Sequence, residues 1–450
     1  FTKEKTLNIS LNELATKGPA MDFYVNPHVK NMERIFPMQG RYDYQRYDMN
    51  ENPEGLPHWF VQEVLTEITP THLSTYPEPQ RFIEKYAEFL QVQPDNVTVT
   101  NGSDQAIRYL LQVFGQEGGD CITVAPSFEM YWVNCKLLGI NHIPIPYEED
   151  LSFDMEKLLD AITPNTNIVV LLNPNNPVGN AFSRDEVEAV VAKAEEHGAV
   201  VIIDEAYHYF FDATFLDLAI SRPNVIVLRT FSKLFSLAAC RIGAVIANPQ
   251  IIHYVNNLKL TFDVNAIALK FAERILDHPT MVQELIDSEK EGRRWILQAL
   301  TDLGYCARRC EGNFIFVEPK NPAPEVARAL EDNKVLVKSW NNGDLSRFIR
   351  VSTGSKEAME KFLDAFLTAS LTVCIGAMAI VGSIQDGILG DHATLFAKAV
   401  LDLVIIMVMT ASMGKGCIFS AIPVGILQGS VTLLARLLQP VFTDAALDRK

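Results

Sequence analysis

The chain lacks several features that would point to whole classes of protein. It has no excess of positive charge, since 39 Lys and Arg stand against 55 Asp and Glu, a formal net charge of -16. Such a surface repels the phosphates of nucleic acid, so we expect no nucleic-acid partner. The seven cysteines are scattered, and Cys306 and Cys310 have no second pair or histidine cluster to complete a zinc pattern. We therefore expect no metal site, and reduced cysteines in a cytoplasmic protein.

The start of the sequence also lacks a positively charged segment followed by a short apolar run, so we expect no secretory signal peptide. Residues 1–45 are mixed in composition and weakly patterned, which predicts an N-terminal arm. Composition shifts once, near residue 370, beyond which the chain is far more apolar. At roughly 150 residues per domain, the length allows two or three domains.

Apolar runs of strand length alternate with helical patterns between residues 97 and 247. This alternation predicts an α/β fold with a mostly parallel sheet covered by helices on both faces. Long helices are expected over 249–300. Beyond them, separate strands near 314–317, 335–337 and 348–351 predict a smaller α+β unit.

One lysine, Lys233, lies just after the buried strand 225–228, beside Ser232 and eight residues before Arg241. A partly desolvated lysine near a cation has a lowered pKa and forms a Schiff base with an aldehyde. The hydroxyl and the guanidinium are suited to a phosphate. An aldehyde that carries a phosphate suggests pyridoxal 5'-phosphate (PLP), and a solvated loop lysine is the alternative interpretation of this stretch.

The strand 97–100 runs into Asn101-Gly-Ser-Asp104 and then into a helix. A strand, a glycine turn and a helix N-terminus form a geometry that cradles phosphate, here with Ser103 and Asp104. An ordinary capped helix explains the same residues.

Further side chains with suitable chemistry fall at strand ends or in the turns that follow. Asp204 can pair with a ring nitrogen and hold it protonated. Tyr207 and Asn176 can reach the phenolic oxygen of the same ring, and Phe128 offers a face for stacking. Because ligands bind at the carboxyl ends of parallel strands, we expect these residues to form one site.

From about residue 46 to 368 the chain resembles the fold-type I aminotransferases of class I/II, most closely the histidinol-phosphate aminotransferase branch. The residues that carry the resemblance are Asn50-Glu-Asn-Pro53, Tyr76-Pro77, Asn101-Gly-Ser-Asp104, Pro126-Ser-Phe128, Asn173-Pro-Asn-Asn-Pro177 with Gly179, Asp204-Glu-Ala-Tyr207, Phe231-Ser-Lys233, Arg241-Ile-Gly243 and Arg350.

The resemblance implies a role for each matching residue. Lys233 would hold PLP as a Schiff base and then act as the general base, and Asp204 would bind the pyridine nitrogen. Asn176 and Tyr207 would bind the ring oxygen, and Phe128 would stack on the ring. The phosphate would be bound by Ser103, Asp104, Ser232 and Arg241, and Tyr76 would reach the phosphate of the partner subunit's cofactor. Arg350 and Asn52 would bind the substrate. The working unit would be a homodimer.

The implied activity moves an amino group between an amino acid or amino phosphate and a 2-oxo acid. Lys338 stands where the branch usually has a second arginine, and Ala239 stands where the family usually has glycine. Because Lys338 lacks the planar fork of an arginine, amino donors other than histidinol phosphate remain alternatives. The alternatives are a PLP-dependent amino-acid-phosphate decarboxylase or lyase, and a membrane-anchored protein that only binds ligand, which would not need Lys233.

We expect an arm at 1–45, a large PLP-binding domain at 46–275, a small domain at 276–368 and an apolar helical tail at 371–450. Residues 416–435 carry no charge and are long enough to span a bilayer, and 403–414 are also uncharged. The stretches 374–387 and 419–423 resemble part of a family of uncharacterised bacterial multi-spanning membrane proteins. A transmembrane tail is the expectation; a buried helical extension and a fusion of two genes are the alternatives.

Overall fold

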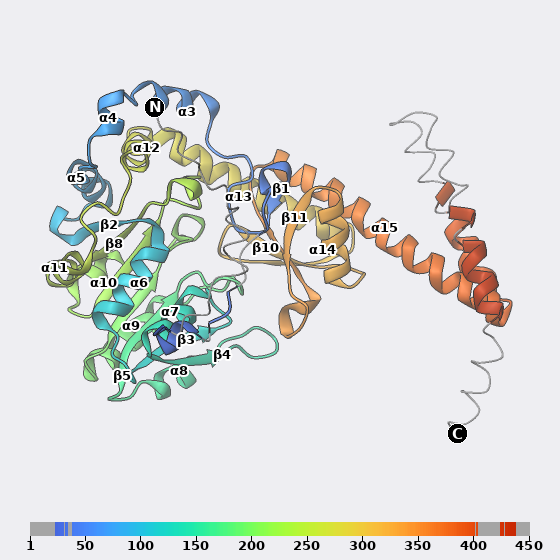
Figure 1. The fold of residues 1–450 in the computed structure, drawn as a ribbon, viewed down its shortest axis with the longest axis horizontal. Helices are drawn as coiled ribbons and strands as arrows, with labels where there is room; N and C mark the ends of the chain where they lie inside the picture. Colours follow the sequence, from blue (N-terminus) through green and yellow to red (C-terminus); the bar gives the residue numbers. More distant parts are fainter. Residues whose placement is uncertain are drawn as a thin grey trace, which may run out of the picture.

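The structure is a computed structural model, and it describes residues 23–30, 32–34, 38–400, 402–403, 424–426 and 428–437, with the backbone alone over 371–378. Residues 45–352 are built around two sheets, and one long helix leads away from them (Figure 1).

The larger sheet has seven strands in the order β2 (Val97–Thr100), β8 (Gly243–Ala247), β7 (Val225–Thr230), β6 (Val200–Asp204), β5 (Thr166–Leu172), β3 (Asp120–Ala125) and β4 (Asn141–Pro146). Within it β8 runs antiparallel to β2 and β7, and the other pairs are parallel. The prediction of a mostly parallel sheet is confirmed. All six residues of β7 are buried, as expected for a strand covered on both faces.

Helices cover both faces of this sheet. Val201 and Ile203 pack into one hydrophobic cluster, whereas Ile202, which lies between them, packs into another, as the two-residue period of a strand requires. The first cluster takes side chains from α5 (Gln80–Leu90), α8 (Met155–Ala161), α9 (Arg184–Glu196), α10 (Leu216–Ser221) and α12 (Ala266–Leu276), and the second from α6 (Gly102–Phe114), α7 (Met130–Leu138) and α11 (Pro249–Leu258). The short helices α2 (Pro27–Lys30), α3 (His58–Thr66) and α4 (Pro70–Ser74) lie before them in the chain.

The smaller sheet has the order β1 (Gln45–Tyr47), β11 (Val335–Ser339), β12 (Ile349–Ser352), β10 (Phe314–Glu318) and β9 (Cys306–Arg309). It packs with α13 (Pro279–Asp302), α14 (Ala323–Asp332) and α15 (Lys356–Leu389), which confirms the smaller α+β unit. Because β1 pairs in parallel with β11, residues 45–47 belong to the smaller sheet, although the large domain is expected over 46–275. A strand of three residues is too short to carry a readable alternation.

The helix α15 does not end near residue 368, as the sequence suggested, but runs to Leu389 and is capped by Gly390 at φ +67°. No proline interrupts it, so nothing in its sequence forces a stop. Phe362 and Phe366 bury its first half in the smaller core, while Ile380 and Val381 are exposed on the half that projects away from the body (Figure 1). Within the described ranges, no helix is both long and apolar enough to cross a membrane; residues 404–423 and 427 of the predicted spans lie outside those ranges.

Candidate active site

The candidate site lies at the carboxyl ends of the central parallel strands, where three neighbouring strands each deliver a polar group. Asp204 is the last residue of β6, Asn176 follows β5, and Lys233 lies three residues beyond β7. The order β7–β6–β5 places these strand ends side by side. The fold thus places Asn176 and Lys233, which are 57 positions apart in the sequence, at the same edge of the sheet.

Asp204 is a buried carboxylate with two donors. Its Oδ2 accepts from the Tyr131 hydroxyl at 2.8 Å, and its Oδ1 accepts from the Ala206 backbone N–H at 3.1 Å. Burial raises the pKa of Asp204 to about 6 despite these bonds. A cationic N–H placed beside it would favour the charged form. Tyr131 was not expected from the sequence, where it reads as one more apolar residue of α7.

Lys233 has the chemistry of a reactive amine. Its Nζ donates to the carbonyl oxygen of Met49 at 2.8 Å and lies 5.8 Å from the centre of the Tyr207 ring. Desolvation lowers the pKa of Lys233 to about 8, and the positive charge of Arg350 acts in the same direction. Although the side chain as a whole is only half-buried, its amine is shielded from water. At neutral pH roughly a tenth of such an amine is unprotonated and nucleophilic.

Tyr207 is buried directly beside this lysine. Its hydroxyl accepts a hydrogen bond from the Asn50 side-chain amide at 2.9 Å, and its ring meets Phe314 edge-on. Burial raises the pKa of Tyr207 to about 12, so the phenol stays protonated and can donate. The sequence indicated Tyr207 but not Asn50, which belongs to a turn-rich loop.

A cradle for an anion forms where α6 begins. The register of β2, β8 and β7 places Thr100, Gly243 and Thr230 side by side, so the segments that follow Thr100 and Thr230 are neighbours. A Cβ on Gly243 would lie 2.8 Å from the backbone nitrogen of Ser103, and one on Gly102 would lie 2.6 Å from Arg241 Nη2. Both positions therefore need glycine, and Gly102 also has φ +76°.

The polar groups of this cradle are held by one another. Arg241 Nη2 donates to Asp104 Oδ2 at 2.8 Å, and Nη1 donates to the Ala238 carbonyl at 3.0 Å. The Ser232 hydroxyl accepts from Thr230 Oγ1 at 3.0 Å. The carboxylate of Asp104 thus orients Arg241, and only its backbone N–H, in the first turn of α6, is suited to a phosphate.

Arg350 lies on the other side of the site, in β12 of the smaller sheet. Its Nη1 donates to Asn176 Oδ1, and its Nη2 donates to the carbonyl oxygen of Asp48 at 2.5 Å. Its buried Nε has no partner among the described residues. Desolvation lowers the pKa of Arg350. Because Arg350 uses the oxygen of the Asn176 amide, the NH₂ of that amide is the group left to donate to a ligand.

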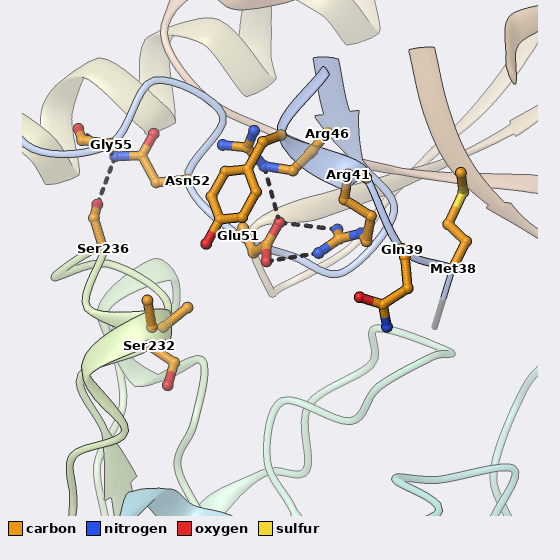
Figure 2. Close-up of a pocket in the computed structure, with 13 residues that line it drawn as sticks. Met38, Gln39, Arg41, Arg46, Glu51, Asn52, Gly55, Ser232 and Ser236 are labelled. Carbon is orange, nitrogen blue, oxygen red and sulfur yellow. Dashed lines mark hydrogen bonds and ion pairs between the residues drawn. The ribbon is translucent and has the colours of Figure 1, made fainter. Parts of the chain in front are cut away.

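A pocket of about 340 Å³ opens beside these residues (Figure 2). Asn52 Nδ2 donates to the Ser236 hydroxyl at 2.9 Å, and Glu51 binds Arg41 and Arg46, as the dashed lines in Figure 2 show. Asn52 also lines a smaller pocket of about 60 Å³ that contains Lys233. The two pockets therefore adjoin at Asn52.

The remaining expected residues take different positions. Phe128 is half-buried and packs on both hydrophobic clusters. Tyr76 is 72% exposed, stacks on Phe262 with ring centres 4.3 Å apart, and lines a surface pocket with Asn101. Ala239, whose methyl group would be strained at positive φ, has no such backbone conformation.

Comparison with known proteins agrees with this geometry. The family described as "Aminotransferase class I and II" matches residues 46–366, and a second, described as "Protein of unknown function (DUF554)", matches residues 342–449. Histidinol-phosphate aminotransferase 2 of Hydrogenovibrio crunogenus is 32% identical over 323 residues, which cover 70% of this chain and 86% of the relative. Histidinol-phosphate aminotransferase of Chlorobaculum tepidum is 30% identical over 346 residues, which cover 76% and 98%.

Among solved structures, histidinol-phosphate aminotransferase from Sinorhizobium meliloti, in complex with pyridoxal-5'-phosphate, superposes with a TM-score of 0.70 at 22% identity, covering 79% of this chain and 99% of that one. That likeness shows a common fold. The family match spans most of the chain, and the curated relatives are covered over most of their length. The chain therefore belongs to the class I and II aminotransferases and is a PLP-dependent aminotransferase.

Proposed function

We propose that this aminotransferase moves an amino group between an amino acid or amino phosphate, of the histidinol-phosphate kind, and a 2-oxo acid. The observation that carries the proposal is the position of Lys233: a desolvated amine with a pKa of about 8, between a phosphate-type cradle and the buried Arg350. The relatives at 28–32% identity are histidinol-phosphate aminotransferases, which supports the substrate class.

The residues present fit PLP, group by group. Asp204 would hold the proton of the ring nitrogen, because burial raises its pKa and a cation beside it would favour its charged form. Tyr207 and the free NH₂ of Asn176 would donate to the ring oxygen, and Phe128 would cover the ring. Ser103, Ser232, Arg241 and the backbone N–H of Asp104 would bind the phosphate. When bound, PLP supplies a protonated ring that withdraws electrons from the substrate.

Lys233 then has two tasks. Its amine would hold the cofactor covalently until substrate displaces it, and afterwards it would carry a proton away from the substrate Cα. A pKa near 8 suits both tasks, because the amine is neutral often enough to accept a proton and basic enough to take it. The Met49 carbonyl offers the released amine a fixed position.

Arg350 and Lys338 would define the anionic ends of the substrate. Arg350 is a buried guanidinium, a group that binds a carboxylate through two parallel hydrogen bonds. Lys338 is its cross-strand partner on β11. It adds a second positive charge without the planar fork of an arginine, which suits a phosphate as a point charge. Asn52, at the junction of the two pockets, would contact the substrate between these ends.

We also propose that the working unit is a homodimer in which Tyr76 reaches the partner's cofactor phosphate. Tyr76 and Phe262 form an exposed stacked pair, and Leu73 and Leu260 are exposed nearby in the sequence. An exposed apolar patch of this kind marks an interaction surface. The cysteines that the structure describes are unpaired, which supports a cytoplasmic catalytic part.

For residues 371–450 we propose association with a membrane. Several side chains on the described part are apolar and exposed, among them Leu389, Phe396 and Leu437. The match of residues 342–449 to a second family supports a separate origin for this segment. It overlaps the aminotransferase match over residues 342–366, which include β12 and about the first three turns of α15. The boundary between the proposed domains at 276–368 and 371–450 therefore lies within one helix.

Replacing Lys233 by alanine should abolish amino transfer while PLP stays bound without a covalent link, because the cradle for the phosphate is intact. Reduction with borohydride followed by mass spectrometry tests the covalent link. Lys259→Ala is the matched control, since desolvation also lowers the pKa of Lys259, which bonds to Thr98 and Val99 instead. Turnover by Lys233→Ala comparable with that of the parent protein would refute the assignment.

Asp204→Asn should stabilise the cofactor-free protein at pH 8. A native pKa raised from 3.8 to about 6 costs the folded state about 3 kcal/mol once the carboxylate is charged in both states. The gain should shrink below pH 6 and vanish below about pH 3, where the carboxyl is protonated in both states. Urea unfolding across this range measures it. With PLP added, the variant should lose most of its turnover, because an amide cannot hold the ring proton.

The control for that experiment is Asp212→Asn. The amine of Lys290 lowers the pKa of Asp212, so this variant should lose stability above pH 4 and have the opposite sign. An unfolding free energy of Asp204→Asn that is independent of pH would contradict the burial of this charge.

Arg350→Lys should raise the KM for the 2-oxo acid about tenfold or more and leave PLP affinity nearly unchanged, because one charged hydrogen bond contributes about 1.5–3 kcal/mol. Steady-state kinetics and PLP titration separate the two quantities. Lys338→Ala should raise the KM for a phosphate-bearing amine but not for an amino acid without phosphate. Loss of PLP by Arg350→Lys would place this residue at the cofactor phosphate instead.

The complete chain should sediment with lipid vesicles, whereas a chain that ends at residue 378 should stay in solution as an active dimer. The cut must follow residue 370, because Ala369 is buried in the smaller core and the Ser370 carbonyl accepts from Asn321 at 2.9 Å. A chain that ends at residue 368 is the control and should melt at a lower temperature. A complete chain that is monodisperse without detergent would overturn the membrane proposal.

A further inference from the structure

Asn50 has no assigned role, yet its side chain contacts the hydroxyl of Tyr207. It lies on the loop between β1 and α3, is 1% exposed, and has a left-handed backbone with φ +55°. We propose that Asn50 is a positioning residue that directs the proton of Tyr207 toward the ring oxygen of the cofactor. This inference rests on the proposed function, because it assigns a task to a residue of that same site.

The first step is the direction of the hydrogen bond. Asn50 Nδ2 donates to the Tyr207 hydroxyl at 2.9 Å, so it occupies a lone pair of that oxygen. In this orientation of the amide, Asn50 Oδ1 faces the Ser352 hydroxyl, which donates to it at 3.5 Å. A hydroxyl that accepts one hydrogen bond keeps its own proton to donate elsewhere. The accepted bond also polarises the O–H and strengthens that donation.

The second step is that Asn50 itself is held in place. Its backbone N–H donates to Ser352 Oγ at 2.8 Å, and its carbonyl accepts from Asn313 Nδ2 at 3.0 Å. Asparagine is one of the few residues with a side chain that tolerates the left-handed region. The loop therefore carries the amide to Tyr207 with little freedom to rotate away.

The third step concerns the charges that surround Tyr207. Burial raises the pKa of Tyr207; the charge of Arg350 on β12 opposes this rise and that of Asp204 on β6 adds to it, while Lys233 approaches from the loop after β7. Among the described residues, Asn50 is the one that forms a hydrogen bond with the Tyr207 hydroxyl. Asn50 is thus the contact that sets the rotation of the hydroxyl, whereas the charges set its proton affinity.

A donor aimed at the ring oxygen stabilises negative charge there. The oxygen then attracts the neighbouring cofactor proton less, and the bound cofactor loses that proton at lower pH. Removing Asn50 should weaken the donation, so the pH midpoint at which the absorbance of the enzyme-bound cofactor changes should rise. This midpoint reports the site without any turnover.

The experiment titrates the absorbance of PLP-loaded protein between pH 5 and 10. Asn50→Gly keeps the left-handed backbone and removes the amide, and should raise the midpoint by about 0.5–1 pH unit, the value of one neutral hydrogen bond. Asn50→Asp has the same shape but places an acceptor at the tyrosine proton, and should raise it by at least as much. Asn224→Ala, a buried asparagine that donates to Val191 and Ala199, is the control and should leave the midpoint unchanged.

The decisive comparison is a double variant. Because Asn50 is inferred to act through Tyr207, Asn50→Gly should cause no further shift in a Tyr207→Phe background. An equal shift in both backgrounds, or an unchanged midpoint in both folded Asn50 variants, would overturn the inference and leave the proposed function standing. If the parent protein never shows the absorbance of covalently held PLP, the proposed function fails, and the inference fails with it.

Discussion

The rest of the site depends on one buried charge, the guanidinium of Arg350. Two of its nitrogens are met by neutral oxygens, the Asn176 side chain and the Asp48 carbonyl, and no carboxylate among the described residues forms an ion pair with it. A cation removed from water without a counter-charge is costly, so the elements around it must be held firmly. Its positive charge adds to desolvation in lowering the pKa of Lys233, and it opposes the burial that raises the pKa of Tyr207. An anionic substrate would supply the missing counter-charge, which explains why a fold would retain such a group.

Burial shifts the pKa values of two other groups, Asp204 and Lys233, in opposite directions. It raises the pKa of Asp204 to about 6 and lowers that of Lys233 to about 8. Lys233 is thereby brought closer to exchanging a proton near neutrality, as a general base requires, whereas Asp204 would need a neighbouring cation to stay charged. The buried pair Arg229 and Glu205, next to Asp204 in the sequence, shows the contrast: there the two charges satisfy one another at 2.8 Å and form part of the core.

The parts of the site that lie at strand ends could be predicted from the sequence, because the end of an apolar run is visible in the residues themselves. Lys233, Asp204 and Asn176 are of this kind. The contacts that complete them could not be predicted, since Tyr131 and Asn50 meet their partners across 73 and 157 positions of the chain. The larger sheet was likewise predictable from its alternation of strands and helices. The three-residue β1 depends on pairing with a distant strand, and α15 continues because its sequence has no proline to end it.

The place of β1 has a consequence for the order in which the protein is made. The loop that supplies the Met49 carbonyl and Asn50 leaves the ribosome early, but it is anchored to Ser352, 302 positions later. During synthesis the large sheet can therefore complete its strands and its anion cradle while Lys233 still lacks the lid of main chain that desolvates its amine. The desolvated surroundings that lower the pKa of Lys233 are therefore a property of the finished fold, completed only when the last strand of the smaller sheet has been added.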